Sequence, residues 1–106
     1  MLSKKNRVSS KDVDLIFKSG KSISSLNFNF KFIKSPLGGW KISFIVPKSV
    51  AKSAVRRNLL RRRGYSVLKK INQSPLGIIG VFIFKKYQDD PVVIENEIKN
   101  IFSKIY

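Results

Sequence analysis

The residues best suited to chemistry in this sequence are cations, and they gather in one stretch from Pro47 to Lys70. Nine residues of this stretch are basic and none is acidic. The basic residues are Lys48, Lys52, Arg56, Arg57, Arg61, Arg62, Arg63, Lys69 and Lys70. A solvated helix usually alternates Glu with Lys, because like charges one turn apart cost about 0.2–0.5 kcal/mol per pair. A polyanion would relieve that repulsion, so the stretch predicts a surface that binds nucleic acid.

Helical periodicity divides the same stretch into two neighbouring faces, each about 100° wide. One face is apolar and is predicted to pack against the core. It holds Leu60, Gly64, Val67, Leu68 and Ile71. The other face offers three cations, an amide and a phenol. It holds Asn58, Arg61, Arg62, Tyr65 and Lys69. We therefore expect a helix that packs on one side and binds phosphates on the other.

The residue types that are missing exclude several kinds of active site. There is no cysteine and no histidine, which excludes Cys/His zinc sites and Ser–His or Cys–His nucleophiles. Metal-assisted phosphodiester hydrolysis needs clustered carboxylates. The six acidic residues lie near the two ends of the chain: Asp12, Asp14, Asp89, Asp90, Glu95 and Glu97. We expect no catalytic residue and no metal site in the protein.

Length and composition indicate a globular protein. The 106 residues are predicted to form one domain, 1–106, and the apolar content of 42% argues against disorder despite a net charge of +16. No apolar stretch follows the basic start, so no signal peptide is expected. The longest apolar run, Gly77 to Phe84, is too short to span a bilayer. We expect a cytoplasmic protein without membrane contacts.

Before the basic stretch, the pattern predicts a short helix followed by one or two strands. Ser9 or Ser10 can cap the helix, and Gly20 is placed to end it. One helical face would carry Val13, Ile16 and Phe17. From Lys21 to Lys34 the side chains alternate, as in a strand. The predicted core side carries Leu26, Phe28, Phe30 and Phe32. The opposite side carries Asn27, Asn29, Lys31 and Ile33. This composition is equally typical of a half-exposed sheet and of a ligand-binding sheet surface.

The remaining elements flank the basic helix. A turn at 35–39 precedes a strand from Trp40 to Val46, and a loop at 72–77 follows the helix. Ile78 to Phe84 is nearly all apolar, which predicts a strand covered on both faces. Asp90 and Pro91 then start an amphipathic closing helix. This order predicts an α+β fold, a small sheet packed with helices.

The basic helix carries small and basic residues spaced around an Arg-Asn pair: Lys48, Ala54, Arg57, Asn58, Leu60, Arg61 and Arg62. The first predicted helix ends in Phe17-Lys18-Ser19-Gly20, and the next strand contains Asn27-Phe28-Asn29-Phe30. These motifs, in this order of elements, resemble the protein subunit of bacterial ribonuclease P over nearly the whole chain. The resemblance implies a two-layer αβββαβα-type sandwich with a small mixed β-sheet, like the second domain of ribosomal protein S5.

The chain departs from the family's pattern in two places: in the first helix, and after Arg62, where two apolar residues and another arginine are usual but Arg63, Gly64 and Tyr65 follow. Tyr65 stands where a cation is expected, and Val13 stands where the first helix often carries an aromatic residue. Gly64 costs the helix about 1 kcal/mol relative to alanine, which predicts a bend or close packing there.

The resemblance also implies a function. In this family a catalytic RNA removes the 5′ leader from precursor tRNA, with Mg²⁺ bound mainly by the RNA, and the protein is a subunit of that endoribonuclease. The implied partners are the ribonuclease P RNA and the precursor tRNA, with no obligate protein partner. The RNA-binding residues would be Lys48, Lys52, Arg56, Arg57, Asn58, Arg61, Arg62, Tyr65 and Lys69. A cleft beside the helix would bind the leader through Val13, Phe17, Asn29 and Lys31.

Two of these residues have alternative interpretations, as does the function. Phe17 could pack in the core rather than stack on a base, and Arg57 could pack through its stem. The main alternative function is that of a small basic ribosomal or general RNA-binding protein with no role in tRNA processing. A helix-turn-helix DNA-binding protein needs two adjacent helices, and the strand predicted before the basic helix argues against it.

Overall fold

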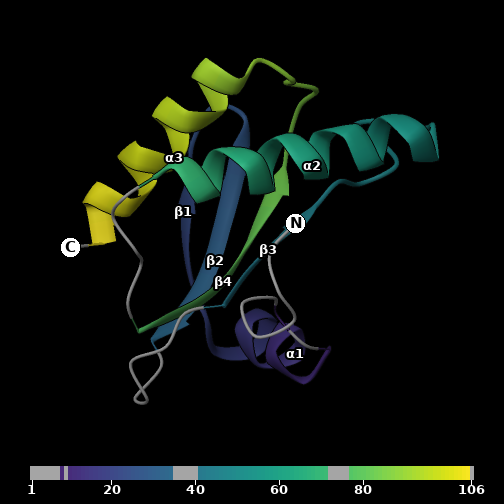
Figure 1. Cartoon of the computed structure of the whole chain (residues 1–106). Coiled ribbons are helices and arrows are strands. Elements are labelled where there is room, and N and C mark those ends of the chain that lie inside the picture. Colours follow the sequence, from purple (N-terminus) through teal and green to yellow (C-terminus); the bar gives the residue numbers. More distant parts are fainter. Residues whose placement is uncertain (1–7, 9, 35–40, 72–76, 106) are drawn as a thin grey trace.

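The computed structural model describes residues 8, 10–34, 41–71 and 77–105. Within them the chain forms three helices and four strands (Figure 1). In chain order these are α1 (Ser10–Ser19), β1 (Lys21–Ser24), β2 (Phe28–Lys34), β3 (Lys41–Ile45), α2 (Ala54–Lys70), β4 (Ile78–Phe84) and α3 (Pro91–Ile105). The α+β class and the αβββαβα order are confirmed, with a separate short strand before Asn27. The predicted cap at Ser9, the turn at 35–39 and most of the loop at 72–77 lie outside the described residues.

The four strands form one mixed sheet in the order β1-β2-β4-β3. β2 pairs antiparallel with both β1 and β4, whereas β3 and β4 are parallel. Parallel neighbours need a long crossover connection, and α2 is part of it. β4 lies in the interior of the sheet, which accounts for its nearly continuous apolar sequence.

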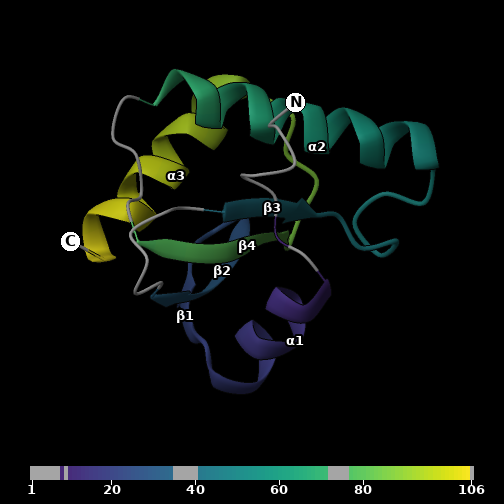
Figure 2. The same cartoon turned by 60° about the horizontal axis from the view of Figure 1, so that its bottom comes forward.

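Alternate side chains of the strands point to a core face, which α2 and α3 cover (Figures 1 and 2). The rings of Phe30 and Phe82 stack there with 4.2 Å between their centroids. Phe102 of α3 meets Phe82 edge to face at 5.8 Å. Such aromatic pairs add about 0.5–1.5 kcal/mol each beyond the burial of their surface. The alternation predicted for β2 is confirmed from Phe28 onwards, since Phe28, Phe30 and Phe32 are all buried.

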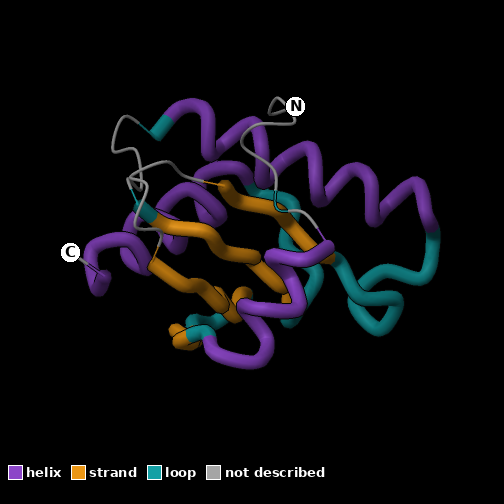
Figure 3. Tube along the Cα trace, turned by 90° about the horizontal axis from the view of Figure 1, so that it is seen from below, coloured by secondary structure: helices purple, strands orange, loops and turns teal. Residues whose placement is uncertain are grey.

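The opposite side of the sheet is called the α1 face here, because α1 packs across one end of it (Figures 2 and 3). Ile16 of α1 and Val81 of β4 are both buried on this side. β4 is therefore covered on both faces, as predicted. On β2 the same face carries Asn29, Lys31 and Ile33, all partly buried. The helix ends before Gly20, as the sequence predicted, and the Gly20 amide donates to the carbonyl of Ile16 at 2.8 Å.

The prediction for Leu26 is wrong, because the strand pattern breaks at the turn between β1 and β2. Leu26 lies in that turn with 67% of its surface exposed. The next residue, Asn27, is buried and donates to the carboxylate of Glu97 on α3 through its side chain and its backbone amide. The Ser25 hydroxyl donates to the same carboxylate at 2.6 Å. These hydrogen bonds hold the turn against α3 and leave the side chain of Leu26 facing solvent.

Helix α2 docks on β3 through a glycine. The ring of Phe44 lies so close to Gly64 that a Cβ atom there would be 2.6 Å from a ring carbon. Of the two interpretations of Gly64, close packing is confirmed, and α2 continues through it without a break. The ring of Tyr65 meets the same phenylalanine edge to face at 5.1 Å.

Gly64→Ala is expected to destabilise the protein, although alanine is the better helix former. Alanine gains about 1 kcal/mol in helix propensity, whereas overpacking against a buried ring costs about 1–3 kcal/mol. Chemical denaturation measures the net change in the free energy of unfolding. Ser66→Ala is the matched control, since Ser66 is exposed on the same helix and gains propensity without a packing cost. Equal stabilisation by both substitutions would contradict the docking contact.

Candidate nucleic-acid interface

The basic helix starts at a serine cap and lacks the charge pattern that usually stabilises a helix. Ser53 is the N-cap, and its hydroxyl accepts from the Arg56 amide at 3.5 Å. The first turn contains no acidic residue. Because the helix dipole is positive at this end, cations here are unfavourable for the isolated helix. The same arrangement of dipole and cations favours a bound anion.

The predicted packing face of α2 is confirmed, since Leu60, Gly64, Val67, Leu68 and Ile71 are all buried. Burial within the helix begins only at Leu60. The first turns of α2 extend beyond the edge of the sheet (Figures 1 and 2). The cations at this end of the helix therefore stand clear of the core.

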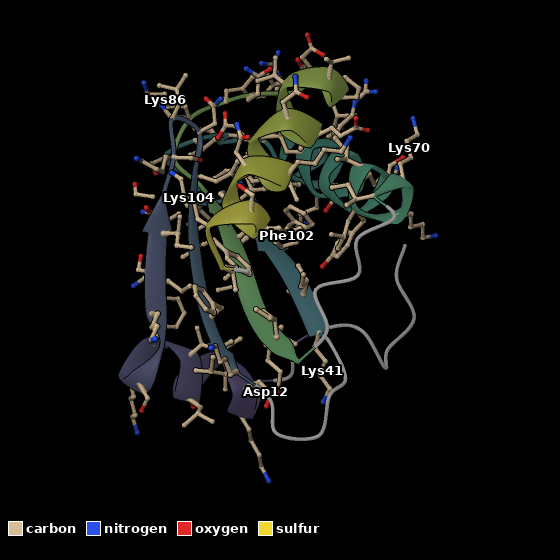
Figure 4. All side chains as sticks on the ribbon, turned by 90° about the vertical axis from the view of Figure 1, so that its left-hand side faces the viewer. Asp12, Lys41, Lys70, Lys86, Phe102 and Lys104 are labelled. Atoms are coloured by element: carbon tan, nitrogen blue, oxygen red, sulfur yellow. The ribbon has the colours of Figure 1, made fainter. Side chains whose placement is uncertain are left out.

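The charges of α2 are not neutralised by acidic side chains of the described chain. Ion pairs among the described residues join Lys41 to Asp12 at 3.6 Å and Lys99 to Glu95 at 3.3 Å (Figure 4 shows the first). Neither pair includes a residue of α2. Most of the predicted RNA-binding cations are exposed, namely Lys48, Lys52, Arg56, Arg62 and Lys69. The helix is therefore a source of positive potential at the surface.

Four of the predicted RNA-binding residues line one hollow of about 220 Å³: Asn58, Arg61, Arg62 and Tyr65. Nη2 of Arg61 donates to Oδ1 of Asn58, one turn earlier on the helix. This bond orients the Arg61 guanidinium and leaves the other donors of both side chains for a ligand. The hollow has the size and the donors to receive a phosphate or the edge of a base.

Tyr65 forms the buried wall of this hollow. It is only 6% exposed, and its hydroxyl accepts from the backbone amide of Phe44 at 3.4 Å. β3 is an edge strand, so an amide on its outer side needs such a partner. This contact gives a physical reason for a tyrosine where the family pattern has a cation. The sequence placed Tyr65 on the polar face but gave no sign of its burial.

Arg57 has a structural role that the sequence did not indicate. Its Nη1 donates to the carbonyl oxygens of Ala51 and Lys52 at 3.1 and 2.8 Å. Both carbonyls belong to the turn before α2, in which the amides of Val50 and Ala51 donate to Pro47. Arg57 is partly buried, which agrees with the packing interpretation, and its guanidinium also holds a turn that carries two predicted RNA-binding lysines, Lys48 and Lys52.

The predicted leader residues all lie on the α1 face. Phe17 is 47% exposed, and Nζ of Lys31 lies over its ring, 4.6 Å from the centroid. Core packing therefore does not account for Phe17. Asn29 is two residues from Lys31 on the same side of β2, and Val13 lies one turn before Phe17 on α1. Because α1 and α2 lie on opposite sides of the sheet (Figure 2), these four residues of α1 and of the α1 face of β2 are across the sheet from α2, rather than in a cleft beside that helix.

The described residues contain neither a metal-binding cluster nor a membrane-spanning helix. No group of three or more His, Cys, Asp or Glu side chains that could hold a metal ion occurs there. No helix in this part of the chain is long and apolar enough to cross a bilayer.

A small α+β fold, a helix of cations without acidic partners and a half-exposed aromatic ring on α1 are features of small basic proteins suited to bind a polyanion. The model of the family described as Ribonuclease P matches residues 2–106. The chain therefore belongs to the ribonuclease P protein family, and the resemblance seen in the sequence is confirmed.

Solved structures of the same family share the fold. The Staphylococcus aureus RNase P protein has a TM-score of 0.82 at 19% identity, covering 96% of this chain and 96% of that one. The Thermotoga maritima RNase P protein has a TM-score of 0.82 at 25% identity, covering 94% and 97%. A second Staphylococcus aureus structure has a TM-score of 0.76 at 20% identity, covering 97% and 91%. A comparison with curated proteins gave no match.

Arg57→Ala and Arg61→Ala are each expected to flatten the salt dependence of RNA binding. The slope of log K against log salt is expected to change by about 0.7–0.9 for each phosphate that the variant no longer binds. Arg57→Ala should reduce the affinity further at every salt concentration, because it also releases the turn before α2. Fluorescence anisotropy over a salt series measures both effects.

The control is Lys104→Ala, which removes an exposed cation from α3 and should leave the slope unchanged. Unchanged slopes in both arginine variants would remove α2 from the interface.

Proposed function

We propose that this protein binds the catalytic RNA of ribonuclease P and the 5′ leader of precursor tRNA. In doing so it assists the endonucleolytic cut that gives the mature 5′ end. The observation that carries the proposal is the set of unneutralised cations on α2 in a chain of this family. The complex would act in the cytoplasm.

The α2 surface suits a folded RNA. Guanidinium forks such as those of Arg61 and Arg62 bind phosphates with two donors at once, whereas the surrounding lysines act as point charges. The Asn58 amide lies in the same hollow and can donate to a 2′-hydroxyl or to a base edge. Contacts of these kinds depend on the shape of the RNA more than on its sequence.

The α1 face suits a single strand. A base can stack on the exposed ring of Phe17 for about 1–3 kcal/mol without sequence preference, which fits leaders of variable sequence. Lys31 is in place to meet the adjoining phosphate, and Asn29 can bond to a base or a sugar.

The described residues contain no group of acidic side chains that could hold a metal ion, and we propose that Mg²⁺ is held mainly by the RNA. The acidic side chains of the described chain are dispersed and many have protein partners. Asp12 pairs with Lys41, Glu97 accepts from the β1–β2 turn, and Asp90 accepts from the Val92 amide at 2.9 Å at the start of α3. The protein's part is therefore to bind and orient the two RNA molecules.

The test is leader cleavage at low magnesium concentration. A ribonuclease P RNA and a precursor tRNA are incubated with and without the protein, and the 5′ ends of the products are mapped. We expect correct cleavage to be restored, and no cleavage by the protein without the RNA. If the protein binds the RNA but leaves cleavage unchanged, the general RNA-binding function replaces the proposal.

Phe17→Leu is expected to weaken binding of precursor tRNA by about 5-fold to 150-fold, the equivalent of 1–3 kcal/mol of stacking free energy. Binding of mature tRNA, which has no leader, should not change. Leu15→Ala is the control, because Leu15 is a similarly exposed apolar side chain on α1. The same loss with mature tRNA would show that Phe17 does not contact the leader.

A further inference from the structure

Ser66 lies at the centre of a patch of cations on the outer side of α2. Side chains three and four residues apart are neighbours on the surface of a helix. For Ser66, all four of these neighbours are cations, namely Arg62, Arg63, Lys69 and Lys70. All five side chains are exposed, and together they are named the Ser66 patch here. Arg63, Ser66 and Lys70 are not among the RNA-binding residues predicted from the sequence.

The Ser66 patch faces away from the core. Ser66 follows Gly64, against which the ring of Phe44 packs, by two residues, and two residues correspond to about 200° around a helix. Ser66 is therefore nearly opposite the docking contact of α2. The side chain of Lys70 points away from the sheet (Figure 4). The hollow on α2 described above lies beside the patch, because Arg62 belongs to both.

Acidic side chains do not balance the charge of the Ser66 patch within the described residues. Neither ion pair found there includes a member of the patch. The sequence has no acidic residue between Leu15 and Gln88. The helix dipole favours Lys69 and Lys70, which lie in the last turn of α2, but its effect does not extend to the two arginines. The helix therefore tolerates repulsion around Ser66 that a bound anion would relieve.

The residue at the centre of the patch suits a phosphate. A long side chain at position 66 would fill the space between the cations, whereas serine leaves it open and adds an O–H donor. A phosphate oxygen that accepts from this hydroxyl would lie within reach of the guanidinium forks on one side and the ammonium groups on the other. Charged donors surround this position, so its ligand is expected to be an anionic acceptor.

RNA is the polyanion that best matches the position of the patch. Arg62 connects it to the hollow, so a chain with phosphates at regular intervals can occupy both. An acidic protein surface presents single carboxylates rather than such a chain. We propose that the Ser66 patch is a second phosphate site on α2, which binds a backbone phosphate of an RNA that also enters the hollow. That this RNA is the catalytic RNA rests on the proposed function.

Ser66→Glu tests the site, because it should change stability and binding in opposite directions. Ser66→Gln has the same size without the charge and is the matched control. The new carboxylate would pair with the four cations, so the midpoint of chemical denaturation should be higher for Ser66→Glu than for Ser66→Gln. Binding of Ser66→Glu to a bacterial ribonuclease P RNA should weaken by about 10-fold or more, since a charge-assisted contact is lost.

The slope of log K against log salt identifies the lost contact. For Ser66→Glu it should become shallower by about 0.7–0.9, the contribution of one phosphate, whereas Ser66→Gln should keep the wild-type slope. Arg63→Gln/Lys70→Gln removes two cations of the patch that do not line the hollow and should also make the slope shallower. Ser103→Glu adds the same charge at an exposed position on α3 and should leave the slope unchanged. A wild-type slope in Ser66→Glu, or the same change in Ser103→Glu, would overturn the site.

Polyglutamate distinguishes RNA from an acidic protein partner. We expect it to bind the wild type more weakly than the RNA does at the same salt concentration. Binding as tight as that of the RNA, with the same loss in Ser66→Glu, would assign the patch to an acidic protein and overturn the proposal.

Failure of the site and failure of the proposed function give different results. If the wild type promotes leader cleavage but Ser66→Glu retains the wild-type slope, the proposed function stands and the site fails. If the wild type leaves cleavage unchanged but Ser66→Glu has a shallower slope with any structured RNA, the site stands and the proposed function fails.

Discussion

The contact between Gly64 and the ring of Phe44 sets the position of the cationic helix. Without a side chain at residue 64, α2 lies directly against β3, and the Tyr65 hydroxyl reaches the Phe44 amide. This contact also fixes the orientation of the helix about its own axis, in which Leu60 is buried and Arg62 is exposed to solvent. Repulsion among the cations opposes formation of this helix, and burial of its apolar face offsets that repulsion. Two uncharged residues thus determine where the charges lie.

The sheet then separates the two proposed RNA surfaces and connects them rigidly. On one side of the sheet, the core-facing Phe44 of β3 contacts α2. On the other side, β2 presents Asn29 and Lys31. β4 hydrogen-bonds to both strands, so a ladder of backbone bonds fixes the distance between the surfaces. If the protein presents two RNA molecules to each other, as proposed above, such a framework would help, because strands shift less than loops.

The sequence predicted what depends on local periodicity and missed what depends on distant partners. The buried face of α2, the end of α1 before Gly20 and the start of α3 at Asp90 follow from spacing along one element. The burial of Tyr65 could not be predicted, since its partner is an edge-strand amide 21 residues away. The exposure of Leu26 likewise depends on Glu97, 70 residues beyond Asn27. The role of Arg57 depends on a turn whose shape no helical pattern reveals.

The ammonium of Lys31 above the ring of Phe17 changes how binding on the α1 face must be understood. In the free protein this ring face already has a partner, held by a cation–π attraction of about 0.5–1 kcal/mol. A base that stacks there displaces the ammonium, which is then free to turn toward the nearest phosphate. Association of the proposed leader with this face would therefore be an exchange of partners, and its free energy would be the difference between the two attractions rather than the whole of one.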